Sequence, residues 1–149
     1  MIKKYKVSSV FALVIVAGIL FIFYRFHRHD TKALKDFVAA YEKFDKAIAD
    51  FSSGETDDLE SKAGEALVEL NIKASVRLSS LVENDTELMS KKLEIADLSG
   101  KEMDHLRAYK RAIKSHNPDL DALAKESGDL TSKRKAAFAR FQELAGLKD

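Results

Sequence analysis

The chain has no cysteine among its 149 residues. This absence excludes disulfides, thiolate metal sites and cysteine nucleophiles. The sequence also contains no glycine-rich phosphate loop, no nucleophile elbow and no zinc-protease signature, and its acidic residues form no recognisable catalytic pair. We therefore expect neither an enzyme nor a cofactor-binding or metal-binding protein.

Strand-like alternation of polar and apolar residues is also missing, and the sequence has only one proline. Apolar residues recur instead at spacings of three and four, which is the period of an amphipathic helix. The sequence therefore predicts an all-α fold.

Acidic residues are absent from the first 29 positions, where five basic residues give a charge of +5. They are Lys3, Lys4, Lys6, Arg25 and Arg28. Because the whole chain has 25 basic and 24 acidic residues, the remaining 120 carry a charge of −4. A mildly acidic domain on a basic stalk argues against nucleic acid as a partner, since phosphates require a basic excess.

The longest uncharged stretch covers residues 7–24 and is dominated by Val, Ile, Leu and Phe. As a helix it reaches about 27 Å, close to the hydrocarbon thickness of a bilayer, which is about 30 Å. The flanking lysines and arginines can extend their charged ends into the membrane interface. We predict a basic tail over residues 1–6, a transmembrane anchor over 7–24 and a basic collar over 25–30.

Two other readings of this segment are a cleaved signal and a lipid-attachment site. Val16-Ala17-Gly18 is the only weak cleavage site, and cutting there would leave an apolar start on the mature chain. The stretch around Gly18 resembles the lipobox of bacterial lipoproteins, but Ile19 stands where that motif requires cysteine. A retained anchor is therefore favoured over a cleaved signal and over a buried core helix.

The charges on the two sides of the anchor nearly cancel, so the positive-inside rule gives little bias. In a bacterial membrane, the three lysines of the tail would have to cross against the membrane potential to reach the outside. Long segments translocate largely regardless of their charge. We therefore expect a cytoplasmic N-terminus and an extracytoplasmic helical domain.

Residues 31–149 are expected to form an antiparallel up-down bundle of about four helices. The first helix can continue the anchor without a break, and its stripe is Leu34, Phe37, Tyr41, Phe44, Ile48 and Phe51. The second, from about 59 to 82, carries Leu59, Ala63, Leu67, Leu70, Ala74, Leu78 and Leu81. A further apolar line, Val68, Ile72 and Val76, suggests that this second helix is covered on two sides.

The third helix would bury Met89, Leu93, Ala96, Met103, Leu106 and Ile113, with Gly100 at a close helix contact. The fourth would bury Leu120, Leu123, Leu130, Phe138, Phe141 and Leu144. Among all these positions, we expect the interior to contain Phe37, Phe44, Leu67, Leu70, Leu106, Phe138 and Phe141.

Turn signals separate the helices. Gly54 suits a left-handed C-cap, followed by Thr56, Asp57 or Asp58 as the next N-cap. Asn84 can end the second helix, with Asp85 or Thr86 capping the third, although one long helix through Asn84 is the alternative. Asn117 and Pro118 suit the start of the fourth helix, and Gly146 suits its end.

Two histidine motifs could bind metal. Glu102 and His105 form a Glu-x-x-His pair, but the second copy that a di-iron bundle requires is absent. We therefore expect Glu102 and His105 on a solvated helix face. His27 and His29 flank Arg28, whose charge disfavours a metal ion, so we expect a membrane-interface collar there.

Residues 105–116 contain basic residues and no acidic one. Arg107, Lys110, Arg111 and Lys114 form a possible interaction patch for anionic lipid, cell-wall polymer or an acidic partner. The favoured alternative pairs them with acidic residues near the second helix, such as Glu55, Asp57, Asp58, Glu60, Glu65 and Glu69. Residues 130–142 repeat the basic bias with Lys133, Arg134, Lys135 and Arg140.

A basic tail, one membrane span and a helical bundle are typical of structural or adaptor proteins. We expect an envelope protein that contacts the lipid bilayer and binds another membrane or envelope protein, or itself. The alternative is an extracytoplasmic ligand-sensing bundle without its own output domain, although no small-molecule ligand is indicated. A polar-lined pocket between helices would favour the sensor, and a solid interior would favour the adaptor.

Overall fold

The computed structural model describes residues 3–76, 78, 85–116 and 119–147, without the side chains of residues 3–14 and 22–31. All regular structure in these residues is helical, and no strand occurs among them. The prediction of an all-α helical bundle is confirmed at this level.

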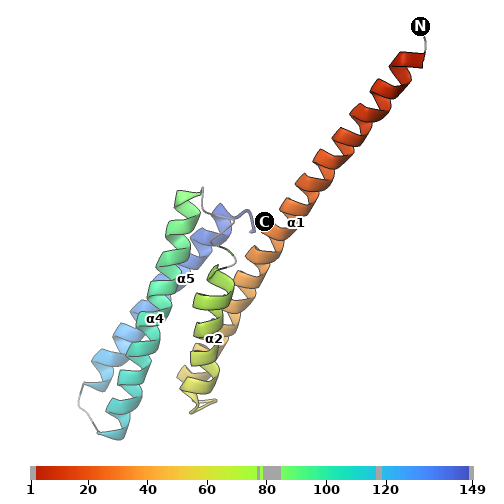
Figure 1. The fold of residues 1–149 in the computed structure, drawn as a ribbon. Coiled ribbons are helices and arrows are strands. Elements are labelled where there is room, and N and C mark those ends of the chain that lie inside the picture. The colour runs from red at the N-terminus through yellow and green to blue at the C-terminus, as the bar shows by residue number, and fades with distance from the viewer. Residues whose placement is uncertain (1–2, 77, 79–84, 117–118, 148–149) are drawn as a thin grey trace.

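The first element, α1 (Lys3–Ser52), is one continuous helix of 50 residues. Its first part, residues 3–31, extends alone beyond the other helices and is called the arm below (Figure 1). Its second part packs into the bundle from Ala33 onward. The helix ends at Ser52, and Gly54 follows it with a φ of 78°. Glu55 N donates to Asp50 O, which completes the expected C-cap at Gly54.

The described part of the second helix covers residues 59–76 and 78 and contains π-helical turns on either side of a short α-helical segment. Its parts are η1 (Glu60–Gly64), α2 (Glu65–Val68) and η2 (Glu69–Ala74). The side chain of Asp58 accepts a hydrogen bond from Ser61 N at 3.0 Å. Of the three expected N-cap candidates, Thr56, Asp57 and Asp58, it is therefore Asp58 that caps this helix.

The chain then turns back into α4 (Thr86–Lys114), whose N-cap Asp85 accepts from Leu88 N at 3.0 Å. Contacts of Asn71 with Ala96 and of Ser75 with Lys92 show that the second helix and α4 are antiparallel neighbours. Two helices are therefore present, and Asn84 lies outside the described residues.

The last helix, α5 (Leu120–Leu144), returns along α4 and ends at Gly146, where φ is 63°. The Gly146 C-cap is thus confirmed, whereas Asn117 and Pro118 lie outside the described residues. The second helix, α4 and α5 lie alongside the second part of α1 (Figure 1).

Aromatic side chains form the centre of the core. Phe37 and Phe141 lie 4.9 Å apart between ring centroids, and Tyr41 stacks on Phe138 at 3.5 Å. All but one of the residues expected in the interior are buried. The exception is Leu67, which is partly exposed and packs against the core. The buried set also contains Phe44, Leu70 and Leu106.

The buried face of α4 differs from the prediction. Leu93 is 57% exposed and Ile113 is 48% exposed, because the face turned inward carries Leu88, Ile95 and several polar residues. A Cβ on Gly100 would meet no atom within 4 Å, so the expected close helix contact there is also wrong.

The second apolar line of the second helix is likewise not covered. Val68, Ile72 and Val76 are all exposed, Val76 by 67%. The helix has one neighbour on each side, α1 through the Lys43–Glu69 ion pair and α4 through Asn71, and the face between those neighbours stays open.

The expected anchor lies in the arm. Of its side chains, the structure describes only those of residues 15–21. Among the described residues, no helix has a stretch long and apolar enough to span a membrane. The anchor over residues 7–24 therefore stays a prediction.

Candidate functional site

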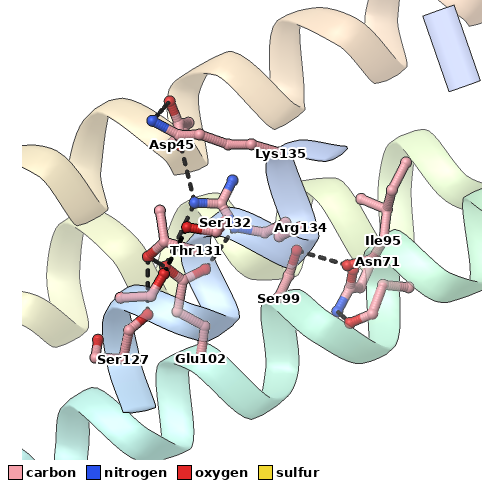
Figure 2. Close-up of polar contacts among 12 residues, drawn as sticks. Asp45, Asn71, Ile95, Ser99, Glu102, Ser127, Thr131, Ser132, Arg134 and Lys135 are labelled. Atoms are coloured by element: carbon pink, nitrogen blue, oxygen red, sulfur yellow. Dashed lines mark hydrogen bonds and ion pairs between the residues drawn. The ribbon is translucent and has the colours of Figure 1, made fainter. Parts of the chain in front are cut away.

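A buried arginine joins three helices at the centre of the bundle. Arg134 of α5 is 0% exposed, and its Nε donates to Glu102 Oε2 of α4 at 2.5 Å. Its Nη2 donates to Asp45 Oδ1 of α1 at 2.8 Å (Figure 2). Thr131 donates its hydroxyl hydrogen to the second oxygen of Glu102. Asp45, Glu102, Thr131 and Arg134 are called the Arg134 cluster below.

Aromatic rings flank the guanidinium group. Its carbon lies 5.1 Å from the ring centroid of Tyr41 and 5.2 Å from that of Phe44, within cation–π range. Burial alone would lower the pKa of Arg134, but its bonds to Glu102 raise that pKa above its usual value. Burial also raises the pKa of Tyr41 to about 12. The cluster therefore holds a cationic arginine beside a neutral tyrosine near neutral pH.

The expected Glu-x-x-His face is not solvated. Glu102 is fully buried against Arg134, and that expectation is wrong because a buried arginine offsets the carboxylate's desolvation. His105 donates from Nε2 to Leu123 O at 3.0 Å, and Glu126 lies 3.4 Å from the same nitrogen. Among the described side chains, no group of three or more His, Asp or Glu residues is arranged to hold a metal ion.

A cleft of about 680 Å³ opens next to the Arg134 cluster, between α1, α4 and α5. Asp45 and Thr131 belong to both the cluster and the cleft. Its larger apolar side chains are Ile48, Phe51, Leu106, Tyr109 and Ile113. A mainly apolar cleft with a polar inner end thus lies open between part of α1 and the α4–α5 pair.

The expected basic patch lies on α4 beside this cleft. Arg107 binds Glu60 through Nε at 2.7 Å, and Lys110 donates to the carbonyl of Asp57 at 2.5 Å. Arg111 and Lys114 are exposed. Part of the basic charge is thus engaged by residues at the start of the second helix, and the role of the patch as an interaction surface remains a prediction.

The second basic run is divided between interior and surface. Arg134 is buried, whereas the exposed Lys135 lies 3.5 Å from Asp45. Arg140 pairs with Glu87 of α4 at 3.0 Å. Lys133 is exposed. The side chains expected at the membrane interface, Lys3, Lys4, Lys6, Arg25 and Arg28, lie outside the described ones, as do His27 and His29.

Sequence reasoning missed the Arg134 cluster and the cleft. Arg134 and Glu102 sit among other charged residues, and neither helix shows a spacing that separates a buried charge from a solvated one. One weak signal of a buried Glu102 was present in the sequence of α4. Glu102 lies on the same helical face as the apolar residues Ile95 and Leu106.

Comparison of the chain with protein-family models, curated proteins and solved structures gives no match.

Proposed function

We propose that this protein is a membrane-anchored helical bundle of the cell envelope that acts through contacts with another protein or with a second copy of itself. The observation that carries the proposal is α1. One helix connects an exposed apolar stretch in the arm directly to the core of the bundle.

The apolar side chains of the arm support the anchor. Ile15, Val16, Ile19, Leu20 and Phe21 are exposed, Phe21 by 63%. Soluble monomers rarely expose such a contiguous apolar surface. Lipid would cover these side chains on all sides, and the helical backbone continues through the whole uncharged segment of residues 7–24.

The exposed line of Val68, Ile72 and Val76 supports an adaptor role. These side chains lie on the bundle, on a helix whose inner face is already packed. An uncovered apolar line of this kind is a suitable contact surface for another protein.

Membrane fractionation tests the anchor. We expect the full chain to remain in the membrane pellet after high-salt and carbonate washes, and the variant V16D/I19D to leave it. The matched variant I72D/V76D, which alters exposed apolar residues of the bundle, should stay in the pellet. Release of the unaltered chain, or a mature N-terminus at or after Ile19, contradicts the proposal.

Photocrosslinking tests the adaptor role. A photoreactive residue at Ile72 should give a discrete adduct in intact membranes, and the same residue at exposed Ser132 of α5 should not. Absence of an adduct at Ile72 argues against a protein contact on this line.

A second candidate function is ligand sensing, and the cleft is the observation that favours it. Its volume and its mainly apolar walls with a few polar groups are typical of small-molecule sites. An adaptor bundle does not need such an opening.

A further inference from the structure

We propose that the cleft binds an uncharged, mainly apolar small molecule with a hydrogen-bond acceptor directed toward Lys135. This inference rests on the second candidate function and names the chemical class of its ligand.

The cleft exists because α5 packs closely over only part of its length. The buried residues of α5 are Arg134, Ala137, Phe138 and Phe141, all in its second half. Its first half, before the Arg134 cluster, lines the cleft with Ala124, Ser127 and Gly128. Arg134 thus marks the point where packing against α1 gives way to an opening.

The two walls differ in side-chain size. Ile48 and Phe51 of α1 and Tyr109 of α4 provide large apolar surfaces, while the first half of α5 contributes small side chains. A Cβ on Gly128 would meet no atom within 4 Å, so the space in front of this helix is open. The volume of about 680 Å³ lies within the usual range for ligand sites, roughly 300–1,000 Å³.

The charges in the cleft favour an uncharged ligand. At the inner end, Asp45 is held by Arg134 at 2.8 Å and lies 3.5 Å from Lys135. At the outer end, Lys110 donates to the carbonyl of Asp57 and lies 5.9 Å from the Phe51 ring centroid. Lys110 is thus already engaged by a neutral acceptor, whereas at the inner end an anion already contacts two cations. A charged ligand group at the inner end would lose hydration without gaining an unopposed partner.

Lys135 supplies the polar contact. Its ammonium group has three hydrogens, and its ion-pair partner Asp45 is already bound by Arg134. The side chain is 56% exposed and lines the cleft, so it can donate to an acceptor atom on the ligand. The ligand would place its apolar part against Phe51 and Tyr109.

Protection of a single cysteine tests this inference, since the chain contains no other. The full chain carrying G128C, in phosphatidylcholine nanodiscs, would be reacted with a small water-soluble methanethiosulfonate. Octanol, octanoate and octylammonium would be added at matched free concentrations. We expect octanol to slow the reaction saturably, with at least tenfold lower half-protection concentration than either charged probe. G100C on α4, which also faces open space but lies outside the cleft, should show no protection.

The outcomes separate the two proposals. Stronger protection by a charged probe overturns the uncharged class and leaves a ligand site, whereas no protection by any probe overturns both the inference and the sensing function. Equal protection of both cysteines also overturns the inference. Adding K135M to G128C should raise the half-protection concentration of octanol about tenfold, since a hydrogen bond from a charged group contributes roughly 1.5 kcal/mol. Lys133 is exposed, and the control variant K133M should leave the half-protection concentration of octanol unchanged. An unchanged value in K135M removes Lys135 from the proposal.

Discussion

Arg134 holds a full charge in the interior of a small bundle. It lies on α5 and binds Asp45 of α1 and Glu102 of α4, so the cluster joins helices that are distant in sequence. A buried ion pair adds little net stability compared with an apolar replacement, but removal of one partner leaves an uncompensated charge. We therefore expect replacement of one charged partner to destabilise the fold, and replacement of both partners by apolar residues to be tolerated.

Replacement of Arg134 by methionine should lower the free energy of unfolding by about 3–5 kcal/mol, because Glu102 then remains charged and buried. The double variant R134M/E102L should recover most of this loss. Denaturant unfolding of the full chain in mild detergent, followed by circular dichroism, measures both. The control K133M alters an exposed neighbour and should change little. An unaltered unfolding curve for R134M contradicts the role of the cluster.

Tyr41 should make the fold sensitive to alkaline pH. Its pKa is raised by burial from 10.0 to about 12, so the folded protein keeps the hydroxyl proton after the unfolded chain has lost it. The stability should be complete below about pH 10 and should decline by up to about 3 kcal/mol as the pH rises to 12. Unfolding curves between pH 9 and 12 measure this. Y41F should reduce the decline, Y109F should retain it, and an equal decline in Y41F contradicts the assignment.

At the scale of the helix, the ends were easier to predict than the faces. Gly54, Asp58, Asp85 and Gly146 act as caps, because capping depends on a few adjacent residues. The face of α4 was predicted only in part. Met103 and Leu106 are buried as expected, whereas Leu93 is exposed. Lys92 is buried instead, with its Nζ bonded to Ser75 O at 3.3 Å. A polar residue on the buried face moves the apparent apolar stripe, and only the neighbouring helix reveals the difference.

The continuity of α1 gives a measurable length. Spin labels at V16C and E42C, two exposed positions 26 residues apart, should be separated by about 39 Å along a straight helix at 1.5 Å per residue. Pulsed electron resonance should give a narrow distance distribution, because no break occurs between them. Two glycines inserted after Arg28 should broaden it. A broad distribution in the parent protein would indicate a hinge between arm and bundle.

At the scale of the whole molecule, the bundle and its aromatic core follow from apolar spacing, whereas the cleft does not. Leu106 and Phe51 were expected on inward faces, but their position beside an opening depends on how far α5 follows α1. The buried residues of α5 begin at the Arg134 cluster, and the first half of α5 lines the opening with small residues such as Gly128. Neither has a periodic signature in the sequence, so the candidate site required the arrangement of the helices.

Orientation in the membrane is the last expected property, and it rests on the proposed anchor. The tail carries three lysines, and the juxtamembrane segment carries Arg25, Arg28, Lys32 and Lys35, so the flanking charges nearly cancel. In a bacterial cell, moving the compact charge of the tail outward opposes the membrane potential, while the long C-terminal portion can cross largely regardless of its charge. Alkaline phosphatase fused behind Asp149 should therefore be active, and a fluorescent reporter that matures only in the cytoplasm should be dark at the same position. The reverse pattern would place the bundle and its cleft in the cytoplasm, where an envelope partner could not reach Val68, Ile72 and Val76.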